Sequence, residues 1–165
     1  MISKILVGGT IFITLLTTLE VVKNDTGPSV HSSSVDTLEL TSAPIKPVWI
    51  LEGNPEARSH EHSASADLSA STAVWESTAG TFRWYFGWDE TVYILEGDVD
   101  VTDEDGKTIK LVKGDIAYFR GGTWATWKID HYVKKVAFMR RPLPKQTASL
   151  VYRFTDFVRR QLDKL

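Results

Sequence analysis

Residues 84–97 read Trp-Tyr-Phe-Gly-Trp-Asp-Glu-Thr-Val-Tyr-Ile-Leu-Glu-Gly, and this stretch decides the fold class. Its two halves look like strands joined by a turn. Alternate side chains of a strand share a face, so Val92 and Ile94 should lie on the face that carries Glu90. Residues 114–127, Gly-Asp-Ile-Ala-Tyr-Phe-Arg-Gly-Gly-Thr-Trp-Ala-Thr-Trp, have the same organisation. These two blocks predict β-hairpins.

Further alternating segments surround the two blocks. Residues 99–102 and 108–112 alternate on either side of Asp-Glu-Asp-Gly at 103–106, where the glycine can adopt the positive φ of a hairpin loop. A short strand at 48–51 comes before them, and residues 132–139 close the set. Many short strands without intervening helices predict an all-β sandwich or barrel.

The remaining segments divide the chain into four parts. Residues 1–23 form a signal-like or membrane-anchor segment, because an apolar run over 5–19 follows a lysine. That run is shorter than the roughly 20 residues that span a bilayer, so a buried strand or helix is the alternative. Residues 24–47 are a Ser/Thr/Pro-rich linker or arm, 48–145 the β-barrel, and 146–165 a C-terminal amphipathic helix. We therefore expect a cell-envelope protein, secreted, periplasmic or membrane-anchored, with a cytoplasmic location as the alternative.

Composition excludes several classes of function. The chain has 165 residues, a net charge of −2 and no cysteine. Without a basic excess there is nothing to hold nucleic acid phosphates. Without cysteine there are no disulfides, thiolate nucleophiles or zinc–sulfur sites.

Two other segments carry specific expectations. Leu150, Phe154 and Phe157 recur at helical steps, so we expect this face to pack on the outside of the barrel, with a dimer contact or a membrane surface as alternatives. Residues 58–73 are rich in Ser and Ala and should form a surface loop. The His60-Glu-His62 sequence inside that loop looks like a metal motif, but we expect it to bind no ion.

Three stretches resemble the cupin superfamily, in particular the small cupin domain named after ureidoglycine aminohydrolase. They are Ile-Leu-Glu-Gly-Asn-Pro-Glu-Ala-Arg at 50–58, Asp-Glu-Thr-Val-Tyr-Ile-Leu-Glu-Gly at 89–97, and Gly-Asp-Ile-Ala-Tyr-Phe at 114–119. The resemblance implies a single double-stranded β-helix (jelly-roll) barrel followed by the C-terminal α-helix. It also implies a homodimer, in which the partner protects strand edges.

The resemblance fails at the residues that bind metal in cupins. Gly80, Glu90 and Gly97 keep the frame of the first cupin motif, and Gly114 and Gly122 keep that of the second. The ligands of the ureidoglycine enzyme would fall on Trp84, Phe86, Glu90 and Ala125, and a single carboxylate cannot hold a transition metal. We therefore expect no metal, no cofactor and none of the family's hydrolytic activity.

The residues that replace the ligands indicate a different kind of site. Trp84 and Phe86 share a strand face that should point into the barrel, where Trp127 and Tyr118 can join them. Together with Ala125, and with Glu90 at the base, they would bind a small, unidentified organic molecule by stacking, and a ligand cation would suit the rings.

Two other interpretations stay open. One is a metal-independent enzyme, similar to ureidoglycine aminohydrolase or to an isomerase, in which Glu90 acts as acid or base. Here Glu90 could instead be a structural acid paired with Arg83 or Arg120. The other is a structural or interaction module in which the same rings simply plug the barrel.

Overall fold

We describe a computed structural model of the chain that covers residues 28–142, 150, 153–157 and 160. The predicted signal or anchor segment at 1–23 lies outside the described residues. Within them, no helix is both long and apolar enough to cross a membrane.

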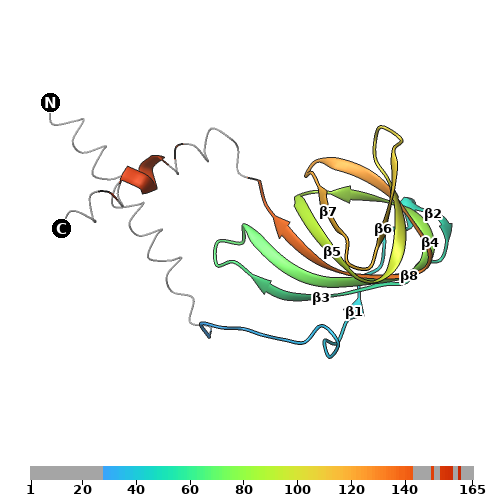
Figure 1. The fold of residues 1–165 in the computed structure, drawn as a ribbon, viewed down its shortest axis with the longest axis horizontal. Helices are drawn as coiled ribbons and strands as arrows, with labels where there is room; N and C mark the ends of the chain where they lie inside the picture. The colour runs from blue at the N-terminus through green and yellow to red at the C-terminus, as the bar shows by residue number, and fades with distance from the viewer. Residues whose placement is uncertain (1–27, 143–149, 151–152, 158–159, 161–165) are drawn as a thin grey trace.

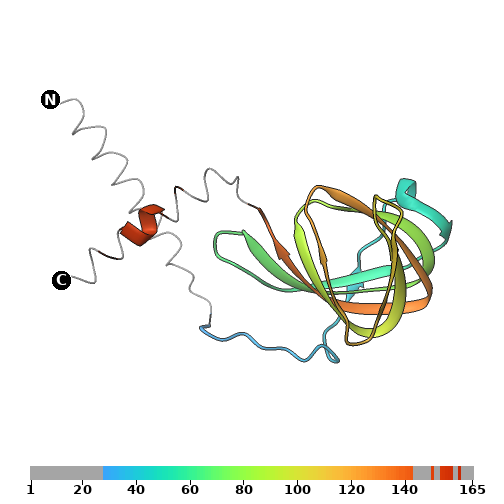
Figure 2. The same ribbon diagram turned by 45° about the horizontal axis from the view of Figure 1, so that its top comes forward.

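The described residues form one antiparallel sheet that curls into a barrel (Figures 1 and 2). The hydrogen-bonded order is β1-β3-β4-β8-β5-β6, while β2 pairs with β4 and β7 pairs with β5. The elements are β1 (Thr41–Ser42), η1 (Pro47–Trp49), β2 (Ile50–Gly53), β3 (Ala57–Ala64), β4 (Ala70–Phe86), β5 (Asp89–Thr102), β6 (Thr108–Val112), β7 (Ile116–Phe119) and β8 (Thr123–Arg140).

Two long strands form the body of the barrel. β4 and β8 pair from Ala70 opposite Arg140 to Phe86 opposite Thr123, with an irregularity between Thr78 and Gly80. β8 also pairs with β5 on its other side, and there the register shifts twice. Irregularities of this kind bend a strand and increase its twist, which lets a single sheet close on itself.

The interior confirms the alternation predicted from residues 84–97. Val92 and Ile94 are fully buried, and Glu90 is buried on the same face. β8 alternates likewise, with Val133, Lys135 and Ala137 buried. The expected all-β barrel is therefore present, and helical residues at 153–157 give the short C-terminal helix.

The surface loop predicted at residues 58–73 is wrong. β3 begins at Ala57 and pairs with β4 from Ala57 opposite Ser77 to Ala64 opposite Ser71, which leaves only 65–69 as the turn. Most residues of β3 are polar, and a strand with one face exposed to solvent tolerates such residues, so composition is a poor guide to it.

The segment before the barrel contacts its outer surface. Lys134 Nζ donates a hydrogen bond to the Val35 carbonyl at 3.2 Å. The two residues of β1 pair with β3, and the side chain of Ile45 belongs to the hydrophobic core. Ordered contacts with the barrel therefore begin before residue 48.

The apolar face of the C-terminal helix is open in its described part. Leu150 and Phe157 are 66% and 59% exposed. The expected packing of this face on the barrel is therefore not seen at these two residues.

Gly97 is a position where the backbone requires glycine. It has φ +71° at the irregular part of the β5–β8 ladder, and a Cβ there would overlap the carbonyl oxygen of Tyr132. Only glycine meets both conditions without strain.

Candidate functional site

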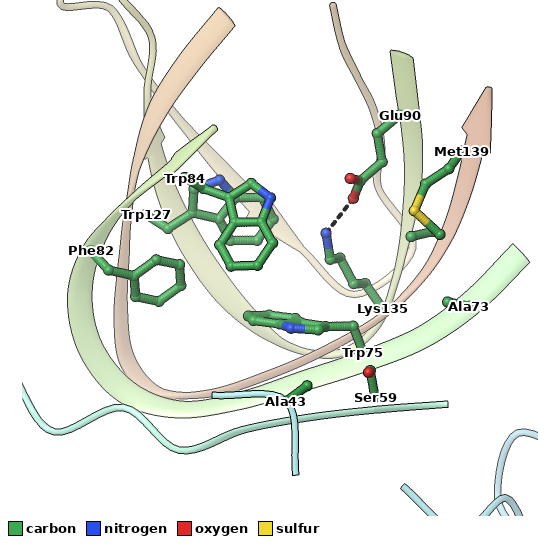
Figure 3. A pocket seen from close by; sticks show the side chains of 11 residues that line it. Ala43, Ser59, Ala73, Trp75, Phe82, Trp84, Glu90, Trp127, Lys135 and Met139 are labelled. Atoms are coloured by element: carbon green, nitrogen blue, oxygen red, sulfur yellow. Dashed lines mark hydrogen bonds and ion pairs between the residues drawn. The ribbon is translucent and has the colours of Figure 1, made fainter. Parts of the chain in front are cut away.

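A cavity of about 210 Å³ opens on the inner face of the barrel (Figure 3). Its walls come from β4, β8 and the start of β5, and its rim comes from β3 and the residue after β1. The side chains that line it are Ala43, Ser59, Ala73, Trp75, Phe82, Trp84, Glu90, Trp127, Lys135, Ala137 and Met139.

A buried ion pair lines this cavity. Lys135 Nζ lies 2.5 Å from Glu90 Oε1, and the two side chains are only 6% and 11% exposed. Figure 3 shows the two side chains pointing toward each other from neighbouring strands. Burial of two charges is tolerated here because each is the other's partner.

The ammonium of Lys135 also contacts aromatic faces. Its Nζ lies 4.7 Å from the ring centroid of Trp127 and 5.2 Å from that of Trp75. Cations are attracted to the negative face of an indole ring. The protein's own lysine therefore lies over Trp127, one of the rings at which we expected a ligand cation.

The rings form a continuous wall rather than separate plugs. Trp75 packs edge to face against Phe82, Trp84 and Trp127, with centroids 6.0 to 6.3 Å apart. Such contacts fix ring orientation and add stability beyond the buried area. The rings therefore hold one another in fixed orientations.

Two buried indole N–H groups of this wall lack a hydrogen-bond acceptor among the described residues. They are Nε1 of Trp75 and Nε1 of Trp127. An unpaired buried donor destabilises the fold by about 1–3 kcal/mol. The two indole rings that bear this cost both line the cavity and contact Lys135.

The structure distributes the predicted site residues over three places. Trp84, Glu90 and Trp127 line the cavity. Phe86 is buried behind it, where it stacks on Phe119 with centroids 4.3 Å apart, so it does not line the cavity. Ala125, opposite Trp84 in the ladder, lines a second cavity of about 510 Å³ between β6, β7 and the start of β8.

The prediction that Tyr118 joins the inner rings is wrong. Tyr118 is 62% exposed, and it lines the second cavity instead of the first. β7 pairs with β5 so that Phe119 lies opposite Glu90, and this register turns Ala117 and Phe119 inward and Tyr118 outward. Its surroundings are polar: partial desolvation raises the pKa of Tyr118, and the nearby carboxylate of Asp89 raises it further.

Sequence reasoning missed Lys135 and two of the rings. Phe82 belongs to β4 in the same alternation as Trp84, whereas Trp75 is out of phase with them, on the other side of the irregularity between Thr78 and Gly80. Lys135 alternates with Val133 and Ala137 on β8. Alternation was therefore an available signal for Phe82 and Lys135, but not for Trp75. The proposed partners of Glu90, Arg83 and Arg120, are both exposed, and Lys135 pairs with it instead.

The donor set does not fit a metal ion. Trp84, Phe86 and Ala125 offer no ligand atoms, and the carboxylate of Glu90 is occupied by the ammonium of Lys135. Across the part of the chain that the structure describes, no three His, Cys, Asp or Glu side chains group closely enough to hold an ion.

The two histidines of the His60-Glu-His62 sequence have other partners. His60 Nδ1 lies 3.0 Å from the carbonyl oxygen of Glu39, and His62 Nδ1 lies 3.1 Å from Ser63 Oγ. Both lie on β3, where one contact holds the preceding segment against the strand.

A second buried carboxylate lies on the outer side of the sheet. Glu76 accepts hydrogen bonds from Arg58 and from the Tyr132 hydroxyl, the latter at 2.8 Å. Desolvation raises the pKa of Tyr132 well above its ordinary value, and the hydrogen bond to Glu76 raises it further. These hydrogen bonds connect β3, β4 and β8, so we interpret the network as stabilising the sheet.

Comparison with known proteins agrees with this fold. Residues 64–137 match the EutQ-like cupin domain. No curated protein matches the chain.

Three solved structures are similar to the chain to different degrees. A DUF861-family protein of unknown function from Pseudomonas syringae is 23% identical with a TM-score of 0.58, over 62% of this chain and 45% of that one. This chain thus spans less than half the length of that protein. The EutQ protein of Clostridium difficile is 16% identical with a TM-score of 0.53, over 66% and 78%. A DUF861-family protein from Thermotoga maritima is 44% identical over 39% of this chain and 73% of its own, with a TM-score of 0.38.

The matches to the Pseudomonas and Clostridium structures show the fold, and the domain match covers β4 to β8 with their jelly-roll pairing. The barrel therefore has the fold of these structures, and residues 64–137 match the EutQ-like cupin domain.

Proposed function

We propose that this barrel binds a small, uncharged organic molecule with an aromatic or apolar body and one hydrogen-bonding group. The observation that supports this most directly is the cavity itself, which has aromatic walls and ends on the Glu90–Lys135 pair. Mostly apolar concave sites with a few convergent polar groups are typical of small-molecule binding.

The charge of the site favours an uncharged ligand. Glu90 and Lys135 are the charged residues that line the cavity, and they neutralise each other. A charged ligand would enter an apolar site with no free counter-charge, and it would lose its hydration without compensation. A single hydroxyl, amide or carbonyl group could instead contact the pair.

The size of the cavity limits the ligand further. Its volume of about 210 Å³ lies below the roughly 300 Å³ at which sites for drug-sized molecules begin. One ring with a short polar substituent is therefore a reasonable occupant. The second cavity is larger, but its charged side chains, such as Glu104 and Arg120, are exposed to water.

A catalytic use of Glu90 is the second candidate. It is favoured by the direct contact between a carboxylate and an ammonium inside a cavity, since such a pair can pass a proton.

The homodimer and the envelope location remain predictions, as does a purely structural role for the barrel.

The test compares ligand binding with the cavity open and filled. Benzyl alcohol and benzamide serve as probes, and binding is measured by thermal shift and by tryptophan fluorescence. At 100 times its Kd a ligand stabilises the folded state by about 2.7 kcal/mol. The Ala73→Leu variant fills the cavity and should abolish the shift, whereas Ala64→Leu makes the same change at an exposed position of β3 and should not.

Two outcomes would count against binding in this cavity. Either no uncharged single-ring compound raises the melting temperature of the wild-type chain, or Ala73→Leu responds to the probes as fully as Ala64→Leu does. Acidic or basic analogues of the same probes, benzoate and benzylamine, should bind more weakly than the uncharged ones.

A further inference from the structure

We propose that Lys135 captures a small uncharged aldehyde or ketone as a covalent imine, with Glu90 carrying the proton. This inference rests on the proposed function, because it places the carbonyl compound in the same cavity. It adds the chemical class of the ligand and a covalent step at a named atom.

The position of the lysine supports this step. Lysine side chains are rarely buried, but Lys135 is buried, and it lines a cavity large enough to hold a small molecule. Amines in apolar sites next to a proton acceptor are the groups that form imines with carbonyl compounds. Exposed lysines of the same strand, such as Lys128, have no buried proton acceptor beside them and line no cavity of this kind.

Glu90 is placed to remove the proton that blocks the amine. Its Oε1 lies 2.5 Å from Nζ, which is hydrogen-bonding distance for a direct transfer. The rings that contact Lys135 exclude water around the pair, and a bound ligand would exclude more. Excluding water lowers the energy of the neutral amine and carboxylic acid relative to the charged ammonium and carboxylate, because charges lose their hydration in a dry site.

The reaction balances without any further reagent. Glu90 takes one proton from the ammonium, and the neutral amine of Lys135 adds to the carbonyl carbon to form a carbinolamine. Glu90 returns the proton to the hydroxyl group, which leaves as water. The net change is R–CHO + Lys–NH₃⁺ → Lys–NH⁺=CHR + H₂O, and the iminium keeps the positive charge opposite the carboxylate.

The walls of the cavity decide which carbonyl compounds fit. Among the described residues Lys135 is the one cation that lines the cavity, and it is paired with Glu90, so an oxo acid would find no partner there for its carboxylate. The faces of Trp84 and Phe82 suit an aromatic or apolar body instead. Benzaldehyde has this chemistry, and benzyl alcohol has the same body without the carbonyl.

The experiment traps the imine by reduction. The full chain is incubated with benzaldehyde and cyanoborohydride, and the gain of one benzyl group is mapped to individual lysines by peptide mass spectrometry. We expect Lys135 to be labelled at least roughly tenfold faster than Lys110 and Lys128, because the cavity holds the aldehyde beside the amine. Excess benzyl alcohol should slow the labelling of Lys135 alone.

Variants separate the covalent step from folding and from binding. Glu90→Gln should slow the labelling of Lys135 by roughly 100-fold, which is the usual size of a lost general acid–base group. Lys135→Arg keeps a cation beside Glu90 and should lose the fast label while the protein stays folded. Labelling of surface lysines provides the reference rate in each variant.

The possible failures are distinguishable. If benzyl alcohol and benzaldehyde bind but Lys135 is labelled no faster than Lys110, the imine is wrong and the binding function stands. If neither compound binds, the proposed function fails as well. Fast labelling of Lys135 that benzyl alcohol does not slow would also overturn the proposal, because the aldehyde would then not be bound in the cavity.

Discussion

Replacing Lys135 by methionine should be one of the most destabilising single changes in the barrel. At 2.5 Å and an effective dielectric constant of about 20, the attraction between Lys135 and Glu90 is about 7 kcal/mol, and the loss of hydration on burial opposes most of it. Removing only the lysine leaves the carboxylate buried without a partner. Breaking such a pair costs about 3–5 kcal/mol, or roughly 10–20 °C in melting temperature for a domain of this size.

Urea denaturation of matched variants measures this loss. Lys128→Met removes an exposed lysine from the same strand and should change the free energy of unfolding by less than about 0.5 kcal/mol. The double variant Glu90→Gln with Lys135→Met removes both charges at nearly constant volume. It should recover most of the stability, to within about 1–2 kcal/mol of wild type.

The reasoning would be refuted if Lys135→Met cost no more than Lys128→Met. Equal losses would mean that water reaches the pair and screens it. A double variant as unstable as the single one would mean that packing of the lysine chain, not charge pairing, is the main contribution.

Three further predictions concern the frame around the site. Gly97→Ala should lower the free energy of unfolding by at least about 2 kcal/mol, because it combines a strained φ with overlap on Tyr132; a loss below about 0.5 kcal/mol in urea denaturation would contradict this. Asp115→Ala should cost about 0.5–1.5 kcal/mol in the same assay, since Oδ2 of Asp115 accepts the Val112 N–H at 2.8 Å. Hydrogen bonds from Ser65 and Ser69 lower the pKa of Asp67 to about 2, so its stabilisation is present above about pH 4 and disappears as the pH falls through about 2. The stability difference between wild type and Asp67→Asn should follow that course, and a difference independent of pH would count against it.

Much of the barrel could be predicted from local patterns. The alternation at Glu90, Val92 and Ile94 gave the correct inner face because a half-buried strand must separate apolar from polar side chains. The same rule fails for β7. In this four-residue strand both Ile116 with Tyr118 and Ala117 with Phe119 form apolar pairs, so only the pairing with β5 decides which pair faces inward.

The inward position of Lys135 was not predicted because lysine is usually an exposed residue. Lys135 follows another lysine, and a Lys-Lys sequence normally indicates exposed surface. The strand alternation of Val133, Lys135 and Ala137 places it inward nonetheless. Its partner could not be predicted, because the contact with Glu90 depends on the register between β5 and β8 across more than forty residues of sequence.

The long ladder between β4 and β8 has a consequence for how the chain reaches this structure. Its pairs join residues 37 apart, Phe86 and Thr123, up to 70 apart, Ala70 and Arg140. Loop-closure entropy must be lost over these distances before the first contacts can stabilise anything. Chains dominated by such non-local pairing fold in roughly milliseconds to seconds, so β4 should spend that interval without its partner β8.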